Sequence, residues 1–162
     1  MEKLSVDEAK THLYHYLTEY TGWKFLKSQQ CLKKVIKDIV FEIRFFASKY
    51  NLSFESVEVN CELVFWCKRL DKTCNVHSVI GGYSFQPQDK YWYDISTMAQ
   101  LSKVEEELAA RIECYALVLI RDFEQDYEKA IHSLKNKDFL KPNNISHLNK
   151  NYENLLQIIS SV

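Results

Sequence analysis

The most regular pattern in the chain is an alternation of apolar and polar residues between Ser56 and Lys68. Side chains of a β-strand point alternately to the two faces of a sheet, so this pattern indicates a strand buried on one face. We therefore expect a half-buried antiparallel strand here. Its apolar set is Val57, Val59, Cys61, Leu63, Phe65 and Cys67, and the intervening set is Glu58, Asn60, Glu62, Val64, Trp66 and Lys68.

Shorter apolar segments on both sides extend this strand into a sheet. In the preceding segment, Ile39–Phe46, every second residue is apolar, and the polar stretch Ser48–Ser53 is suited to turn the chain between the two strands. Further short strands are predicted at Trp23–Lys27, Cys31–Ile36 and Val76–Ile80. We expect a meander of four or five strands, with the strand order left open.

Helical spacing of apolar residues marks the two ends of the chain. The first helix is predicted from Val6 to Tyr20, with Ser5 as its N-cap and Gly22 ending it. After the stop signal Lys141-Pro142-Asn143-Asn144, a last helix is predicted. Its apolar positions are Leu148, Tyr152, Leu155, Leu156 and Ile159.

A long helix is predicted before that stop signal. It is expected to begin near Ser102, because Ser102-Lys103-Val104-Glu105 has the capping-box pattern. Helical spacing extends to Leu134, with or without a break near Asp122–Glu124. Its apolar stripe is Val104, Leu108, Ile112, Tyr115 and Leu119, widened by Ala116 and Ile120.

These elements predict an α+β fold, in which an antiparallel sheet of four or five meandering strands packs against an N-terminal helix and long C-terminal helices. The length of 162 residues fits one domain. We expect residues 1–162 to form that domain, with residues 141–162 as a C-terminal helical extension.

Composition and charge argue against several classes of function. Three glycines leave little material for a glycine-rich phosphate loop. A net charge of −1 gives no overall field to hold nucleic acid or an anionic membrane. No apolar run approaches the roughly 20 residues of a membrane span, and the N-terminus lacks the apolar core of a signal peptide. We expect a cytoplasmic protein that binds no cofactor, nucleic acid or membrane.

Metal ligands and nucleophiles occur only as fragments of known arrangements. His12 and His15 lie three residues apart, and Cys74 and His77, with Cys67 upstream, form a second fragment. Neither supplies the four ligands of a structural zinc site. The five cysteines contain no CxxC pair and are expected to be reduced, mostly structural thiols. We expect no metal and no catalytic residue.

Aromatic residues are concentrated between Tyr83 and Tyr93, a stretch that we expect to be an irregular loop centred on Pro87. Such side chains serve as anchors in recognition surfaces. They serve equally well to cap the open end of a sheet, and both interpretations stay open. The residues concerned are Tyr83, Phe85, Tyr91, Trp92 and Tyr93.

Charge is uneven along the chain, because residues 23–50 are basic and residues 103–140 are acidic. In the acidic part, Asp122 with Asp126 and Glu124 with Glu128 are like-charge pairs four residues apart, which cost about a few tenths of a kcal/mol each. A solvated helix face accounts for them, and so does a surface that binds a cationic partner.

Several short strings resemble a bacterial family of uncharacterised domains, domain of unknown function 4304, over residues 9–135. The resemblance implies an antiparallel sheet covered on one face by helices and carries over no catalytic residue, while residues 141–162 depart from the family's minimal unit. Small bacterial proteins of this kind are also similar to immunity proteins of interbacterial toxin systems. The strings are Gly22-Trp23-Lys24, Phe41-Glu42-Ile43, Ser48-Lys49-Tyr50-Asn51, Tyr91-Trp92-Tyr93 and Tyr115-Ala116-Leu117.

The leading hypothesis is therefore a non-catalytic protein-binding domain, an immunity protein that neutralises a cognate toxin by covering its active site. If that toxin is a nuclease with a basic cleft, acidic side chains stand in for phosphates and speed association. The expected contact residues are Glu105, Glu106, Asp122, Glu124, Asp126 and Glu128, with Tyr91, Trp92 and Tyr93 as anchors.

Two alternatives remain beside this hypothesis. One is a small hydrolase or ligand-binding protein with a pocket beside Tyr83–Tyr93, where titratable groups such as His77 and Asp94 converge. The other is an oligomerising scaffold, since the sequence leaves the oligomeric state open.

Overall fold

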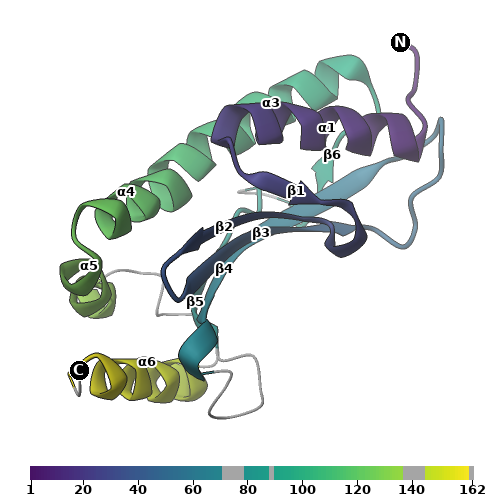
Figure 1. Cartoon of the computed structure of the whole chain (residues 1–162). Coiled ribbons are helices and arrows are strands. Elements are labelled where there is room, and N and C mark those ends of the chain that lie inside the picture. The colour runs from purple at the N-terminus through teal and green to yellow at the C-terminus, as the bar shows by residue number, and fades with distance from the viewer. Residues whose placement is uncertain (71–78, 88–89, 137–144, 161–162) are drawn as a thin grey trace.

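The structure, a computed structural model, describes residues 1–70, 79–87, 90–136 and 145–160. Its centre is an antiparallel sheet in which the strands follow one another in chain order (Figure 1). The predicted meander is thus confirmed, and its order is sequential. The strands are β1 (Lys24–Leu26), β2 (Cys31–Ile36), β3 (Ile39–Ala47), β4 (Glu58–Cys67) and β5 (Val79–Ser84). Part of the predicted strand Val76–Ile80, residues 76–78, lies outside the described residues.

A sixth, very short strand pairs with β4 rather than with β5. Strand β6 (Tyr93–Asp94) pairs with Glu58 and Val59 at the start of β4, along the same edge that β5 occupies further on. The prediction of an irregular loop over Tyr83–Tyr93 is wrong at both of its ends, since Tyr83 lies in β5 and Tyr93 in β6. Backbone pairing with β4 fixes these two residues where an isolated loop would leave them free.

Helix α1 (Val6–Thr21) has the ends that the sequence predicts. The Ser5 hydroxyl accepts a hydrogen bond from the Glu8 backbone N–H, and the Glu8 carboxylate accepts one from the Ser5 N–H at 2.9 Å. This reciprocal pair is a capping box. At the other end Gly22 adopts a left-handed conformation, with φ of 68°, and closes the helix through its N–H to the Thr18 carbonyl.

The long helix begins earlier than predicted. Helix α3 (Met98–Ile112) is capped by Thr97, whose side chain accepts a hydrogen bond from the Gln100 N–H. The predicted start at Ser102 is wrong, and Ser102 is an exposed residue in the second turn. The helix starts earlier because the N-terminal segment fixes the chain just before it. Thr97 pairs with Lys3, and the Ser96 carbonyl accepts a hydrogen bond from the Leu4 N–H at 2.8 Å.

A π-helical turn, Glu113–Leu117, joins α3 to α4 (Val118–Gln125), so one continuous helix spans 28 residues. Five of its buried positions recur every fourth residue, whereas a regular helix turns once in about 3.6 residues. Each step of four therefore leads the previous one by about 40°. The wider π turn takes up that difference and keeps the stripe on the sheet. The positions are Val104, Leu108, Ile112, Ala116 and Ile120.

The helix ends at Asp126, two residues past the region Asp122–Glu124, where the sequence allows a break. Asp126 leaves the helical conformation, with φ of −151°, and its carboxylate caps α5 (Tyr127–Ser133) by accepting from the Lys129 N–H. A short 3₁₀ turn, Leu134–Asn136, follows. Among the described residues, no helix has both the length and the apolar composition that a membrane span requires.

The predicted last helix is present as α6 (Ile145–Ser160). The Tyr152 hydroxyl donates to the Ile131 carbonyl of α5 at 2.8 Å, and the Asn151 side chain donates to the Val79 carbonyl of β5 at 2.8 Å. Tyr152 and Leu155 are buried in the same hydrophobic cluster as the sheet. The helix is therefore anchored to the sheet edge and to α5.

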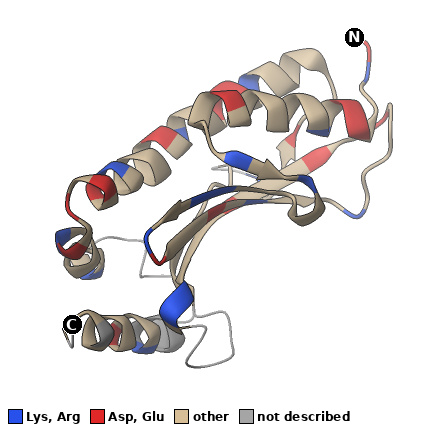
Figure 2. Cartoon of the chain, in the orientation of Figure 1, with Lys and Arg blue, Asp and Glu red and all other residues tan. Residues whose placement is uncertain are grey.

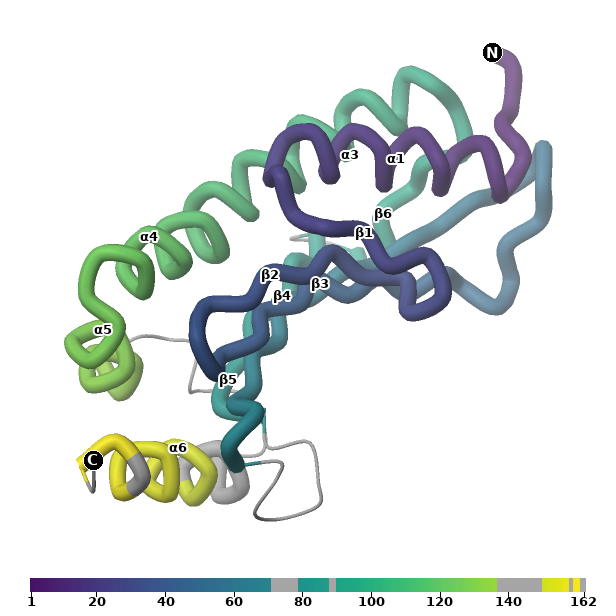
Figure 3. Tube along the Cα trace, in the orientation of Figure 1, coloured from purple at the N-terminus to yellow at the C-terminus, as the bar shows by residue number. Residues whose placement is uncertain are grey.

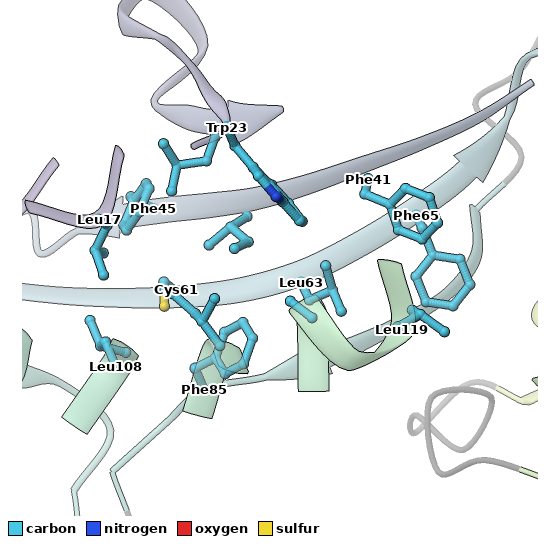
Figure 4. Packing of buried hydrophobic residues seen from close by; sticks show 14 of the residues in the cluster. Leu17, Trp23, Phe41, Phe45, Cys61, Leu63, Phe65, Phe85, Leu108 and Leu119 are labelled. Carbon is cyan, nitrogen blue, oxygen red and sulfur yellow. The ribbon is translucent and has the colours of Figure 1, made fainter. Parts of the chain in front are cut away.

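The core lies between the sheet and the long helix, because α1, α3 and α4 all lie on one side of the strands (Figures 1 and 3). Phe41 of β3 and Phe65 of β4 have ring centroids 5.7 Å apart, and Phe123 of α4 meets Phe41 edge-on at 5.2 Å. Figure 4 shows the Phe41–Phe65 pair beside Leu119. The predicted apolar set of β4 is buried throughout.

The start of α3 is open to a direct test by substitution. We expect Thr97→Ala to lower the free energy of unfolding by about 1 kcal/mol, because it removes the N-cap. Ser102→Ala should change it by less than about 0.5 kcal/mol, since Ser102 is exposed within the helix. Urea unfolding of the two variants makes the comparison, and a larger loss for Ser102→Ala would contradict the observed helix start.

Candidate functional site

The acidic residues expected to bind a partner are spread over α3, α4 and α5. Glu105 and Glu106 belong to α3, Asp122 and Glu124 to α4, and Glu128 to α5. At about 1.5 Å per residue, Glu106 and Glu124 are about 27 Å apart along the helix. The structure therefore separates the two acids of α3 from the acids of α4 and α5.

Several of these acids already have structural partners. Glu124 forms an ion pair with Lys34 of β2 at 3.4 Å, and Asp126 caps α5. Lys37 lies over the ring of Tyr127 in α5, 4.5 Å from its centroid. Lysines of β2 and of the turn after it thus contact the end of α4 and the start of α5. Glu106 and Glu128 are exposed.

The remaining acids differ in their surroundings. Glu105 is half-buried, and burial raises the pKa of its carboxyl, while His12 on α1 opposes that rise. Acidic residues are frequent on α1, α3 and α4, whereas lysines follow β1 and β2 (Figure 2). The helical side of the molecule consequently carries a surplus of negative charge, which favours the approach of a cationic partner.

The aromatic segment divides into a buried and an exposed part. Phe85 and Tyr93 are buried, and Tyr83 stacks on Tyr115 of the π turn with centroids 3.9 Å apart. For these residues the packing interpretation applies. Tyr91 is 62% exposed and meets the partly exposed Trp92 edge-on at 5.1 Å. Of the three expected anchors, Tyr91 and Trp92 are thus accessible and Tyr93 is not.

Tyr93 is instead the centre of a polar network beneath the segment. Its hydroxyl donates to the Phe85 carbonyl and accepts from Arg111 Nη1 at 2.9 Å. Arg111 also donates to the Gln86 carbonyl. Burial raises the pKa of Tyr93 to about 12, and the neighbouring Arg111 opposes that rise. The network fixes the segment on α3.

A hollow of about 620 Å³ opens above this network. One face of α3 forms one side of the hollow. The lining residues of this helix, from Gln100 to Arg111, follow the i, i+3, i+4, i+7, i+11 spacing of a single helix face. Residues 87 and 90–94 supply the opposite side. The lining residues are Pro87, Lys90, Trp92, Tyr93, Asp94, Gln100, Lys103, Val104, Glu107 and Arg111.

The hydrolase alternative places His77 and Asp94 as a titratable pair in such a pocket. His77 lies outside the described residues. Asp94 Oδ1 accepts from the Ser96 N–H at 2.9 Å, and Oδ2 accepts from the Gln100 side chain at 2.8 Å. Asp94 therefore has a structural role in the turn that leads into α3.

A second candidate surface lies at the end of β3 and in the loop that leads to β4. Four large apolar side chains within residues 46–54 face solvent, a set that we call the apolar loop end. They are Phe46, Tyr50, Leu52 and Phe54, which are 44%, 74%, 57% and 64% exposed. Contiguous exposed apolar residues mark interaction sites in soluble proteins.

This loop is held firmly by hydrogen bonds. The Asn51 side chain accepts from the Glu58 N–H at 2.7 Å and donates to the Glu58 carbonyl at 2.9 Å. The Phe54 N–H donates to the Leu4 carbonyl at 2.9 Å, and the Phe54 backbone has a φ of 63°. A left-handed conformation is costly for a bulky residue, so these contacts maintain an exposed aromatic ring at the expense of local strain.

Sequence reasoning missed the apolar loop end because the polar content of Ser48–Ser53 predicts only a turn. The available signal is the alternation of Tyr50, Leu52 and Phe54 with polar residues inside a segment too short for another strand. Apolar side chains in a turn have no core to enter, and that observation could have identified the surface.

Metal ligation finds no support within the described ranges, where no group of three or more His, Cys, Asp or Glu side chains is close enough to hold an ion. His15 Nε2 lies 3.3 Å from a carboxylate oxygen of Glu19. Cys31, Cys61 and Cys67 are buried free thiols, and Cys114 is an exposed one. Cys74 and His77, the second predicted fragment, lie outside the described residues.

Comparison with known proteins adds no identity: no family model, no curated protein and no solved structure matches the chain. The resemblance to domain of unknown function 4304 therefore stays a prediction. Among the structural observations, the geometry of the apolar loop end and of the hollow beside α3 bears most directly on function.

The Tyr93 network should make stability depend on pH in the alkaline range. The folded protein holds the Tyr93 proton up to about pH 12, whereas an unfolded chain releases it near pH 10. The free energy of unfolding should therefore fall as pH rises through this interval, and it should fall less in Tyr93→Phe.

Urea unfolding at pH 9 and pH 11 measures this difference. At pH 9, Tyr93→Phe should be less stable by about 1–3 kcal/mol, because the Phe85 carbonyl loses its buried donor. Tyr91→Phe, at an exposed ring, is the matched control and should stay within about 0.5 kcal/mol of wild type. Equal losses between pH 9 and pH 11 in wild type and Tyr93→Phe would contradict the assigned network.

Proposed function

We propose that this chain is a non-catalytic protein-binding domain, an immunity protein that neutralises a cognate toxin in the cytoplasm by covering its active site. The observation that carries the proposal is the apolar loop end, where Tyr50, Leu52 and Phe54 are held exposed on a hydrogen-bonded loop. The resemblance to small bacterial immunity proteins gives the proposal its biological setting.

A rigid apolar surface suits tight inhibition. Burying a large apolar side chain against a partner contributes about 1.5–3 kcal/mol. Because Asn51 and the Leu4 carbonyl already fix the loop, little conformational entropy is lost when it binds. Aromatic anchors that are ordered before binding are typical of interface hot spots.

The acids of α3 lie at the same end of the molecule. Helix α3 begins at Met98, next to Thr97, which pairs with the N-terminal segment that also holds Phe54. Glu106 is about 12 Å further along the helix. A basic toxin cleft, such as that of a nuclease, would therefore meet apolar anchors flanked by negative charge, which speeds association.

Substitution of the apolar loop end tests the proposal. We expect Tyr50→Ser, Leu52→Ser and Phe54→Ser in combination to abolish capture of the partner from cells of the encoding organism, as measured by mass spectrometry of tagged-protein eluates. The partner captured by wild type should be a toxin-like domain whose activity one equivalent of this protein suppresses.

The matched control changes exposed apolar residues elsewhere. Tyr20→Ser with Val118→Ser removes similar exposed side chains from α1 and α4 and should leave capture intact. Circular dichroism and urea unfolding confirm that both variants fold. Retention of the same partner by the triple variant, or a partner whose activity the protein does not alter, would overturn the proposal.

Charge reversal distinguishes the two groups of acids. Glu106→Lys should slow association with the captured partner about tenfold at low salt, and the difference should shrink as salt is added. Glu128→Lys, on α5 at the far end of the helices, should have a smaller effect, because the interaction between two charges weakens with distance. Both residues are exposed, so the fold should tolerate either change.

Stopped-flow kinetics at two salt concentrations provides the measurement, with Glu153→Lys on α6 as an exposed control. A larger effect from Glu128→Lys than from Glu106→Lys would move the contact surface to α4 and α5. Equal rates for all three variants would remove the acids from the mechanism of association.

A further inference from the structure

The hollow between α3 and residues 87 and 90–94 has an unusual balance of charge. Three cationic side chains, Lys90, Lys103 and Arg111, line it. In the part of the chain that the structure describes, none of the three has a carboxylate within 4.0 Å. Cations that converge on a cavity without a carboxylate partner attract an anion.

The lining also contains two carboxylates, which offset part of this charge. Asp94 is held by Ser96 and Gln100, so its oxygens point into the turn that precedes α3. Glu107 is exposed, with one oxygen 3.4 Å from the Tyr93 hydroxyl. With three cationic and two anionic side chains in its lining, the hollow retains a net positive charge.

Arg111 is fixed in place before any ligand binds. Its Nη1 donates to the Tyr93 hydroxyl and to the Gln86 carbonyl, so the guanidinium plane has a defined orientation at the base of the hollow. A guanidinium held in this way recognises carboxylate or phosphate with little loss of side-chain entropy.

The other side of the hollow offers an aromatic surface. Trp92 lines the cavity and is partly exposed, and Tyr91 braces its ring edge-on at 5.1 Å. An indole face is a favourable contact for a flat ring. The volume of about 620 Å³ is in the range of pockets that hold small molecules.

We propose that this hollow binds a small ligand in which a carboxylate or phosphate is joined to a flat ring. Lys103 and Arg111 contact the anionic group, Lys90 adds a third positive charge at the rim, and Trp92 contacts the ring. The site is separate from the apolar loop end, so it stands or falls independently of the proposed function.

Titrations with four probes test this assignment and identify the anion. Adenosine 5′-monophosphate carries the phosphate, indole-3-carboxylate carries the carboxylate, and adenosine and indole are their neutral counterparts. We expect one of the two anions to bind with a dissociation constant below about 1 mM by calorimetry, at least tenfold more tightly than its neutral counterpart. If adenosine 5′-monophosphate is the anion that binds, it should also change tryptophan fluorescence, and Trp92→Leu should remove that change.

Variants connect the binding to the named residues. Lys103→Gln changes an exposed side chain and should weaken binding of the anion about tenfold, whereas Lys135→Gln, an exposed control elsewhere, should not. Arg111→Met should weaken it further, and circular dichroism checks that this variant folds. Failure of both anions to bind, equal binding of the neutral probes, or an unchanged affinity in Lys103→Gln would overturn the proposal.

Discussion

The burial of the Phe41–Phe65 pair beneath the long helix is the contact on which the rest of the structure depends. β3 and β4 are the two longest strands, with neighbours on both sides, so their core face determines where the helix docks. Phe123 meets Phe41 edge-on at the far end of that helix. The helix in turn positions α5 at one end of the sheet and the chain before Met98 at the other.

Residues 94–100 connect both candidate surfaces through one short segment. The Ser96 hydroxyl accepts from the Val57 N–H at 2.9 Å, and the Ser96 carbonyl accepts from Leu4, whose own carbonyl holds Phe54 in the apolar loop end. On the other side, Asp94 and Gln100 line the hollow. Hydrogen bonds made by this one segment, which leads into the N-cap of α3, thus order two surfaces of different chemistry, one apolar and one cationic.

Periodicity predicted the elements well and their ends unevenly. The β4 alternation identified the core strand, and Ser5 as an N-cap identified the start of α1, because both signals lie within or next to the segment that they specify. The predicted start of α3 was wrong because Thr97 is fixed by pairing with Lys3, a residue distant in sequence. The candidate sites were partly visible as charge and aromatic content. Their division into buried Tyr93 and exposed Tyr91 depends on tertiary contacts that no local pattern contains.

The sequential strand order has a consequence for how the chain folds. Among the strands of the described residues, neighbours in the sheet are neighbours in the chain for every pair except β4 with β6. Most of the pairing therefore closes short loops with a small loss of entropy. β6 pairs with the start of β4, from which it is separated in sequence by the rest of β4 and by β5. The loop contacts of Ser96 with Val57 and Leu4 are therefore expected late in folding, after the hairpins have formed. We therefore expect the segment that orders both surfaces to be the last part of the sheet to assemble.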